Sequence, residues 1–208
     1  MEAWPLFEGD VREVDFKCHE GSIALVTGGP PCQPFSLGGK HQGRLDHRDM
    51  WPEAVRAVRE TQPEAFIFEN VKGLTRETFA TYLAYIVFQL SYPDLKRRRS
   101  ESWLDHHGRL ERQHTSGRGK GGLHYRVINA ADYGIPQRRE RVIFVGFRGD
   151  LNVEWRFPDA THSQDRLLWD QCRVDFSVRE SALLQTFPDN FVFHGSWSPP
   201  IDPMGPLG

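Results

Sequence analysis

The stretch "GGPPCQPFS" at residues 28–36 places a single cysteine, Cys32, among three prolines. Neither a helix nor a strand continues easily through such a run. A disulfide needs a partner and a zinc site needs further ligands, yet only Cys18 and Cys172 accompany it, without CxxC spacing. A core cysteine needs no prolines around it. Taken alone, the stretch leaves two interpretations: a thiol held in place for chemistry, or an inert cysteine in a tight turn.

Short apolar strands and amphipathic helices alternate around this cysteine. The sequence predicts strands at 22–31, 65–71, 125–134 and 141–149 and helices at 49–64, 75–92 and 177–187. Such alternation predicts an α/β fold with a mostly parallel sheet, helices on both faces and ligands at the carboxyl ends of the strands. The "GGPPCQ" and "ENV" stretches both fall at strand ends. We therefore expect them to meet.

A basic segment interrupts this pattern. Residues 93–123 are polar and contain glycine, which predicts a long loop or insertion. Residues 96–126 hold nine Lys and Arg against three acids, although the whole chain has a net charge of −2. Such a segment suits a polyanion, and the DNA backbone is the partner that we expect by default. A solvated loop is the alternative.

Four motifs in order carry a family resemblance. They are "GGPPCQPFS", "FENVKGL", "NAADYGIPQRRERVIFVGF" and "ESALLQTFPDNFVFHGSW", at residues 28–36, 68–74, 129–147 and 180–197. The chain resembles the C5-cytosine DNA methyltransferases of bacterial restriction–modification systems through most of residues 8–197. The resemblance implies an incomplete Rossmann-like sheet, S-adenosylmethionine as methyl donor and duplex DNA as substrate.

The resemblance also assigns catalytic roles. Cys32 would add to carbon 6 of cytosine, because carbon 5 becomes nucleophilic only after such an addition. Glu69 would supply a proton at N3, which a buried strand end would favour by desolvation. Arg141 would bind the cytosine carbonyl and Arg139 the thiolate region or a phosphate. Since the two arginines alternate, a strand would place both on one face.

The remaining site residues surround the base and the methyl donor. The target base must leave the duplex to be reached, and the substrate residues expected around it are Gln33, Ser36, Asn70 and Gln137. The expected cofactor residues are Asp10, at the adenine amino group, with Val11, Pro31 and Met50. No metal is expected.

Parts of the family pattern are missing from this sequence. The Phe-x-Gly-x-Gly loop for the methyl donor does not occur, and few residues separate the last strand from the "LQTFPD" helix. We therefore divide the chain into a catalytic domain (1–150), a remnant of the target-recognition region (151–176), a returning helix (177–197) and an irregular tail (198–208). Alone it is expected to be impaired, with a companion chain supplying the loop as one option. The alternative is a non-catalytic remnant or complementing DNA-binding fragment, and RNA is a third, less favoured substrate.

The composition bounds the setting of the protein. No run of about 18 apolar residues occurs, so no transmembrane helix is expected. The acidic N-terminal stretch lacks a signal-peptide core, and an odd number of cysteines predicts reduced thiols in a cytoplasm. Exposed strand edges predict low solubility or dimerisation through the "IALVTGG" or "FIFEN" stretch.

Overall fold

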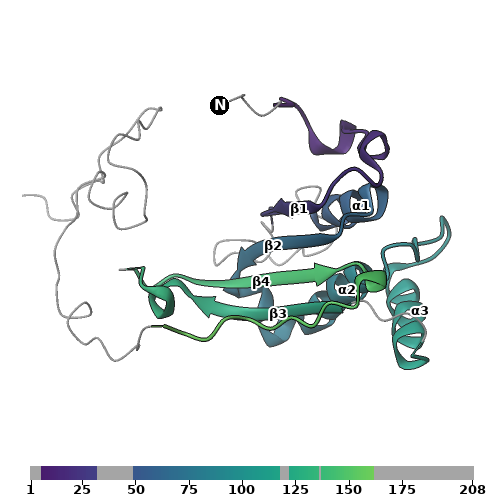
Figure 1. Cartoon of the computed structure of the whole chain (residues 1–208). Coiled ribbons are helices and arrows are strands. Elements are labelled where there is room, and N and C mark those ends of the chain that lie inside the picture. The colour runs from purple at the N-terminus through teal and green to yellow at the C-terminus, as the bar shows by residue number, and fades with distance from the viewer. Residues whose placement is uncertain (1–5, 32–48, 118–121, 136, 162–208) are drawn as a thin grey trace, which may run out of the picture.

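The computed structural model describes residues 6–31, 49–117, 122–135 and 137–161 (Figure 1). The strands are β1 (Leu25–Gly28), β2 (Ala65–Val71), β3 (Gly122–Asn129) and β4 (Glu140–Phe147), and the α-helices are α1 (Trp51–Thr61), α2 (Ala80–Ser91) and α3 (Trp103–Thr115). The 3-10 helices are η1 (Val11–Glu13), η2 (Phe16–His19), η5 (Lys72–Thr75), η6 (Glu77–Phe79), η7 (Ala130–Tyr133) and η8 (Gly149–Leu151). The predicted α/β class is confirmed.

Three of the four described strands run in one direction. The strand order is β1-β2-β4-β3, in which β1 and β2 are parallel while β4 is antiparallel to both β2 and β3, so that β3 runs with β1 and β2. Only a short turn with η7 joins β3 to β4. A parallel pair needs a crossover of a dozen or more residues, whereas a short connection allows only an antiparallel hairpin. The prediction of a mostly parallel sheet therefore holds for the direction of the described strands, with β4 as the exception.

One hydrophobic core lies between the sheet and helices α1 and α2. Trp51, at the start of α1, is fully buried and meets the rings of Phe68 and Phe144 edge-on, with centroids 6.0 and 5.1 Å apart. Ile86 and Leu83 of α2 join the same cluster. A buried aromatic ring contributes a large area to such a core, so Trp51 fixes the start of α1 against the centre of the sheet.

Gly146, a glycine within β4, allows a core side chain from β2 to pack across that strand. The ring of Phe66 on β2 lies across Gly146 on β4, and an added Cβ at Gly146 would stand 2.2 Å from that ring. No other residue type fits at this position without displacing Phe66.

The opposite face of the sheet carries no α-helix from the described ranges. Trp155 covers part of it, contacting His124 and Phe147 at ring-centroid distances of 5.5 and 6.1 Å. Leu25 and Ile67 remain 49% and 38% exposed on that face. The expectation of helices on both faces is thus not met in this part of the chain.

Helices α1 and α2 lie where the sequence predicts them, with shifted starts. Met50 is the N-cap of α1, and Asp49, the predicted cap, accepts a hydrogen bond from the Trp51 amide at 3.1 Å. Proline follows in the first turn, where its missing N–H costs nothing. Helix α2 begins only at Ala80, because the residues before it form η5 and η6.

Helix α3 lies inside the segment that the sequence predicts to be a loop. Ser102 accepts a hydrogen bond from the Asp105 amide at 3.1 Å, and the Asp105 side chain bonds back to the Ser102 amide. This reciprocal capping box stabilises the first turn. The prediction of a loop over 93–123 is therefore corrected, since this segment contains a 13-residue capped helix and the start of β3; the alternative of an insertion is not contradicted by the helix.

Several sequence predictions lie outside the described residues. They are the helix at 177–187, the tail at 198–208 and most of the proposed target-recognition remnant at 151–176. Within the ranges that are described, no helix combines the length and apolarity needed to cross a bilayer.

Candidate active site

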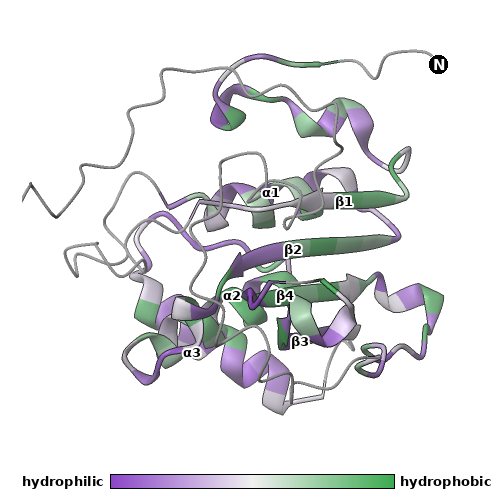
Figure 2. Cartoon of the chain, turned by 90° about the vertical axis from the view of Figure 1, so that its left-hand side faces the viewer, coloured by the Kyte–Doolittle hydropathy of each residue, from purple (hydrophilic) through white to green (hydrophobic). Residues whose placement is uncertain are grey.

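Three motif segments meet at one edge of the sheet. The register pairs Gly28, the last residue of β1, with Phe68, so the loop after β1 runs beside Glu69 and Asn70. Strand β4 runs in the opposite direction, and its start pairs Arg141 with Val71. Figure 2 shows β2 changing from hydrophobic to hydrophilic along its length as it reaches this edge. The prediction that "GGPPCQ" and "ENV" meet at strand ends is confirmed for the residues up to Pro31.

Asn70 ties the cysteine loop to β2. Its side chain is 4% exposed, and its Nδ2 donates to the Pro30 carbonyl oxygen at 2.9 Å. Its Oδ1 accepts from the Val71 amide, also at 2.9 Å. Both ends of the amide group are thereby used within the protein. Pro30, itself buried, precedes Cys32 by two residues, so Asn70 fixes the main chain just before the thiol.

Glu69 lies beside the same loop and against an arginine. A Cβ added at Gly29 would stand 3.4 Å from Glu69 Oε2. Arg141 Nε lies 2.6 Å from Glu69 Oε1, and the two side chains form an ion pair. The geometry of this contact does not meet that of a hydrogen bond donated by Nε. The Glu69 side chain is 43% exposed. The expected burial of this carboxyl group is therefore wrong, because the edge of the sheet opens here to solvent.

Arg139 and Gln137 precede β4 in the chain. The Arg139 amide donates to Asn129 Oδ1 at 3.0 Å, and its carbonyl oxygen accepts from the Ala130 amide at 3.0 Å. Its side chain is exposed. Because β4 starts at Glu140, Arg139 stands just before the strand on which it was predicted. The side-chain oxygen of Gln137 is buried and meets no hydrogen-bond donor among the described residues.

The Lys72–Glu140 ion pair was not predicted from the sequence. Lys72 Nζ is 2.6 Å from Glu140 Oε1, which joins the end of β2 to the start of β4 next to the Glu69–Arg141 pair. The hydrogen bond from Lys72 lowers the pKa of Glu140. The signal was available in "ENVK" and "QRRER", where a lysine and a glutamate each follow a motif residue directly.

Two of the predicted cofactor residues contact each other. The Met50 amide donates to the Pro31 carbonyl oxygen at 3.3 Å, which joins the cysteine loop to the start of α1. The Met50 carbonyl oxygen also accepts hydrogen bonds from the amides of Glu53 and Ala54 in the first turn of the helix. Pro31 and Met50 are thus joined through their main chains at the N-terminus of α1.

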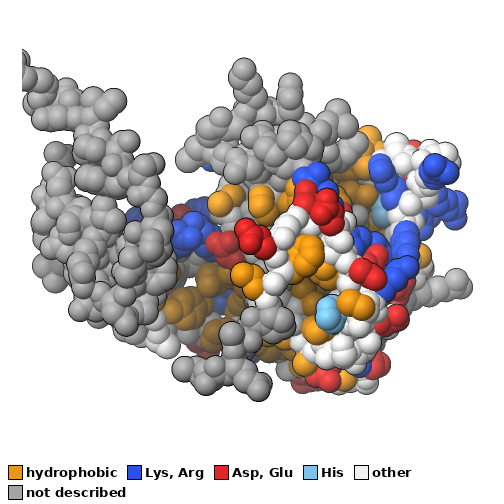
Figure 3. All heavy atoms as spheres, turned by 90° about the horizontal axis from the view of Figure 1, so that it is seen from above, with side chains coloured by type: hydrophobic (Ala, Val, Ile, Leu, Met, Phe, Trp, Pro, Cys, Tyr) orange, Lys and Arg blue, Asp and Glu red, His pale blue; other side chains and the backbone are white. Residues whose placement is uncertain are grey.

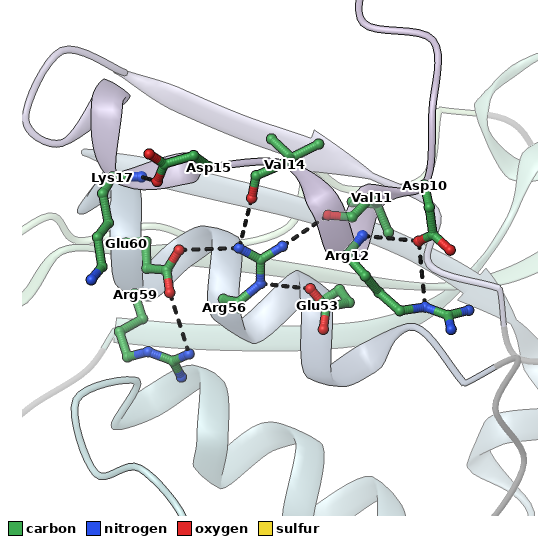
Figure 4. A network of polar contacts seen from close by, with 10 residues as sticks. All are labelled: Asp10, Val11, Arg12, Val14, Asp15, Lys17, Glu53, Arg56, Arg59 and Glu60. Carbon is green, nitrogen blue, oxygen red and sulfur yellow. Dashed lines mark hydrogen bonds and ion pairs between the residues drawn. The ribbon is translucent and has the colours of Figure 1, made fainter.

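The other two cofactor residues lie on a separate segment. Asp10 caps η1 by accepting from the Arg12 amide at 2.9 Å, and its Oδ1 lies 3.4 Å from Arg12 Nε. Val11 follows it and is 38% exposed. Figure 4 shows Asp10 on the Glu53 side of Arg56, toward the start of α1.

Arg56 of α1 holds that segment and was missed by the sequence analysis. Its Nη2 donates to the Val11 carbonyl oxygen and its Nη1 to the Val14 carbonyl oxygen, each at 2.8 Å (Figure 4). Its Nε is 2.6 Å from Glu53 Oε2. No motif signals such a residue, because it acts through backbone groups that are distant in sequence.

Three predicted site residues lie outside the described residues. They are the nucleophile Cys32 and the substrate residues Gln33 and Ser36. Their roles remain predictions. Cys18, by contrast, is exposed on η2 and donates through Sγ to the Asp15 carbonyl oxygen at 3.0 Å.

The basic segment and a cavity next to it lie away from this edge. Figure 1 shows α3 and the chain before it beyond the other end of the sheet, and Figure 3 shows Lys and Arg side chains gathered there. A cavity of about 700 Å³ at that end is lined by Tyr92, Gly122 and Arg148, among others. Neither feature belongs to the candidate site, and the fold does not favour the expected contact of residues 93–123 with DNA bound at that site.

Comparison with known proteins establishes the family. The family model of C-5 cytosine-specific DNA methylases matches residues 4–92 and 121–172. The chain belongs to this family. It is 33% identical over 163 residues to the Type II methyltransferase M.NgoMIV of Neisseria gonorrhoeae, covering 78% of this chain and 44% of that protein. It is 37% identical over 170 residues to the Type II methyltransferase M.AquIA of a Picosynechococcus species, covering 78% and 60%.

A solved structure also matches: that of the Dnmt2 methyltransferase of S. pombe, with a TM-score of 0.42 and 18% identity over 77% of this chain and 42% of that one. The chain spans about half the length of the curated relatives that it matches. Residues 93–120, which include α3, fall between the two matched ranges of the family model.

Proposed function

We propose that this protein transfers a methyl group from S-adenosylmethionine to carbon 5 of a cytosine flipped out of duplex DNA, through a covalent adduct with Cys32. One observation carries the proposal. The hydrogen bond from Asn70 to Pro30, at 2.9 Å, and the approach of Gly29 to Glu69 hold the cysteine loop against the carboxylate. A nucleophile and an acid that act on one ring must be held near each other, and these contacts support such an arrangement by holding residues 29 and 30 beside β2.

The protein side chains divide the reaction between them. The Cys32 thiolate adds to carbon 6, and a proton from the Glu69 carboxyl group goes to N3, so that carbon 5 becomes nucleophilic. Arg141, 2.6 Å from Glu69, is placed to bind the cytosine carbonyl. Methyl transfer leaves S-adenosylhomocysteine; the proton on carbon 5 is then lost to solvent, the N3 proton returns to the Glu69 carboxylate, and expulsion of the thiolate restores the ring and frees Cys32.

The residues present fit a methyl donor. Asp10 offers a carboxylate acceptor at the surface for an adenine amino group, beside the exposed apolar Val11. Pro31 and Met50 supply an apolar wall joined by a hydrogen bond of 3.3 Å. When bound, S-adenosylmethionine supplies an electrophilic methyl group. This set of an acceptor and apolar walls suits adenosine, and the buried, unpaired Gln137 oxygen offers a further acceptor for the flipped base.

The decisive experiment is methyl transfer by the full chain. Purified protein is incubated with duplex DNA and S-adenosylmethionine tritiated in the methyl group, and the radioactivity in the DNA is counted. We expect weak but measurable incorporation by the wild type, since the glycine loop for the methyl donor does not occur in this sequence, and background counts with Cys32→Ser, because serine cannot form the adduct as readily. Cys18→Ser is the matched control and should retain incorporation, since that thiol is exposed on η2, away from the sheet edge.

Two results would count against the proposal. Incorporation that survives Cys32→Ser would exclude the covalent role of this thiol. A wild type that transfers no methyl group while still binding duplex DNA would favour the non-catalytic alternative. A parallel RNA substrate tests the third option in the same assay.

A further inference from the structure

Arg56 is the centre of a charged network on α1. Its guanidinium lies between Glu53 and Glu60, with Nε–Oε2 and Nη1–Oε2 distances of 2.6 and 3.2 Å. It also stacks on the Phe16 ring, 4.6 Å from the centroid. The side chain is only 19% exposed. The two glutamates hold the guanidinium group in one orientation. Its remaining N–H groups then point away from the helix.

Those N–H groups bind the segment that carries the predicted adenine contacts. They donate to the carbonyl oxygens of Val11 and Val14, at 2.8 Å each. η1, with Asp10 as its cap, is therefore held from below by a single side chain (Figure 4). Charge-assisted hydrogen bonds of this kind are among the stronger contacts that a protein can make.

The same helix carries the other side of the predicted cofactor site. Met50 starts α1 and binds Pro31, while Trp51 fixes this end of the helix in the core. Arg56 stands less than two turns further along the helix. One rigid element thus sets the separation between the Asp10–Val11 segment and the Pro31–Met50 wall.

We infer that Arg56 is a positioning residue for the methyl donor. It touches no reacting atom; it holds Asp10 and Val11 at a fixed distance from Pro31 and Met50, so that both contact one adenosine. The inference rests on the proposed function, since it takes these four residues as the cofactor site. Glutamine at position 56 keeps a polar side chain but cannot bind both carbonyl oxygens and both glutamates.

Binding of S-adenosylhomocysteine, measured by titration calorimetry, tests the inference. Arg56→Gln should weaken binding about tenfold or more, as expected for the loss of hydrogen bonds to a charged group. In the transfer assay the KM for S-adenosylmethionine should rise while kcat at saturating donor and the affinity for duplex DNA stay unchanged. Amide hydrogen exchange across residues 11–19 should become faster in the variant without any ligand.

Arg59→Gln is the matched control. Arg59 lies on the same helix with a similar exposure, 18%, and its charged partner is Glu60 at 4.0 Å. It should alter neither the exchange of residues 11–19 nor the affinity for S-adenosylhomocysteine. If Arg56→Gln does not fold, Arg56→Lys serves instead. Lysine keeps the charge between the two glutamates but reaches only one carbonyl oxygen, so the affinity of Arg56→Lys for S-adenosylhomocysteine should fall below that of the wild type.

The outcomes separate the two proposals. A wild type that does not bind S-adenosylhomocysteine would overturn the cofactor site, and the inference with it. Wild-type binding together with unchanged affinity in a folded Arg56→Gln would overturn the inference alone, as would faster exchange without a loss of affinity.

Discussion

Asn70 acts on the main chain of the cysteine loop. It donates to the Pro30 carbonyl oxygen, which cannot reach water because Pro30 is buried. Proline at this position fixes φ, so the hydrogen bond and the ring together leave little freedom just before Cys32. We therefore expect the reactivity of Cys32 to depend on a side chain from the neighbouring strand.

Replacing this amide should impair both stability and chemistry. In Asn70→Ala the buried Pro30 carbonyl loses its donor, which should lower the free energy of unfolding by about 1–3 kcal/mol. A loop displaced by about 1 Å should slow methyl transfer about a hundredfold. Urea unfolding and single-turnover kinetics measure the two effects. Ser91→Ala, which removes a bond to the Val87 carbonyl oxygen on α2, should leave the rate unchanged.

The positions of the motif residues could be predicted from the sequence because they follow strands. The carboxyl ends of neighbouring parallel strands lie at the same edge of the sheet. Glu69 and Asn70 follow this rule. The burial of Glu69 could not be predicted, since it depends on what covers the edge. Arg56 could not be found either, because its partners are backbone carbonyl oxygens 42 and 45 residues away.

At the scale of the element, α3 docks on α2 through a buried histidine. His106 is 2% exposed, with Nδ1 at 2.8 Å from the Tyr85 hydroxyl and Nε2 at 2.6 Å from the Leu95 carbonyl oxygen. A carbonyl oxygen only accepts, so Nε2 carries the proton and Nδ1 accepts from Tyr85. Glu101 and Arg109 form an ion pair nearby, which lowers the pKa of Glu101 to about 2.

Acid should loosen this contact. Burial lowers the pKa of His106 below that of a solvent-exposed histidine, and its hydrogen bond to the Leu95 carbonyl oxygen partly offsets this effect. The folded state therefore prefers the neutral ring. The stability that this preference gives is fully present above the unfolded-state pKa and is lost as the pH falls toward the lower folded-state value.

His106→Phe provides the test of this prediction. It should cost about 1–3 kcal/mol at neutral pH, because the Tyr85 hydroxyl and the Leu95 carbonyl oxygen lose their partner. It should also flatten the decline of the urea midpoint between about pH 7 and pH 5.5. His19→Gln changes an exposed histidine and should keep the wild-type profile. Equal profiles for wild type and His106→Phe would exclude the histidine as the cause.

Elements were predictable where periodicity was strong, as in α1 and α2. The S-x-x-D pattern at Ser102 and Asp105 is typical of a helix start and indicates α3, although the surrounding charged residues favoured a loop. The reversed direction of β4 was not predicted because an α/β pattern was extended to β3 and β4, which no α-helix separates. The short connection between them is the better signal.

At the scale of the molecule, the described sheet ends at β1. This strand pairs with β2 along one side and is an edge of the four described strands. Leu25, on β1, is 49% exposed, and Ile67 on the next strand is 38% exposed. A strand edge with apolar neighbours is a template for pairing with another chain.

We expect concentration-dependent self-association through this edge. Leu25→Lys should shift the protein toward monomer in sedimentation velocity, because a charge on an edge strand opposes pairing. Leu104→Lys is the control, since Leu104 is 56% exposed on α3 and lies beyond the other end of the sheet. A wild type that stays monomeric at high concentration would contradict the prediction.

The two ends of the stretch that carries α3 line one cavity. Tyr92 and Gly122 line the same cavity, and the family model matches the chain on either side of residues 93–120. A segment whose two ends lie together can be gained or lost in one genetic event, because a short turn closes the gap without moving a strand. The stretch that carries α3 therefore stands apart from the two matched ranges of the family model, at the end of the sheet opposite the candidate site.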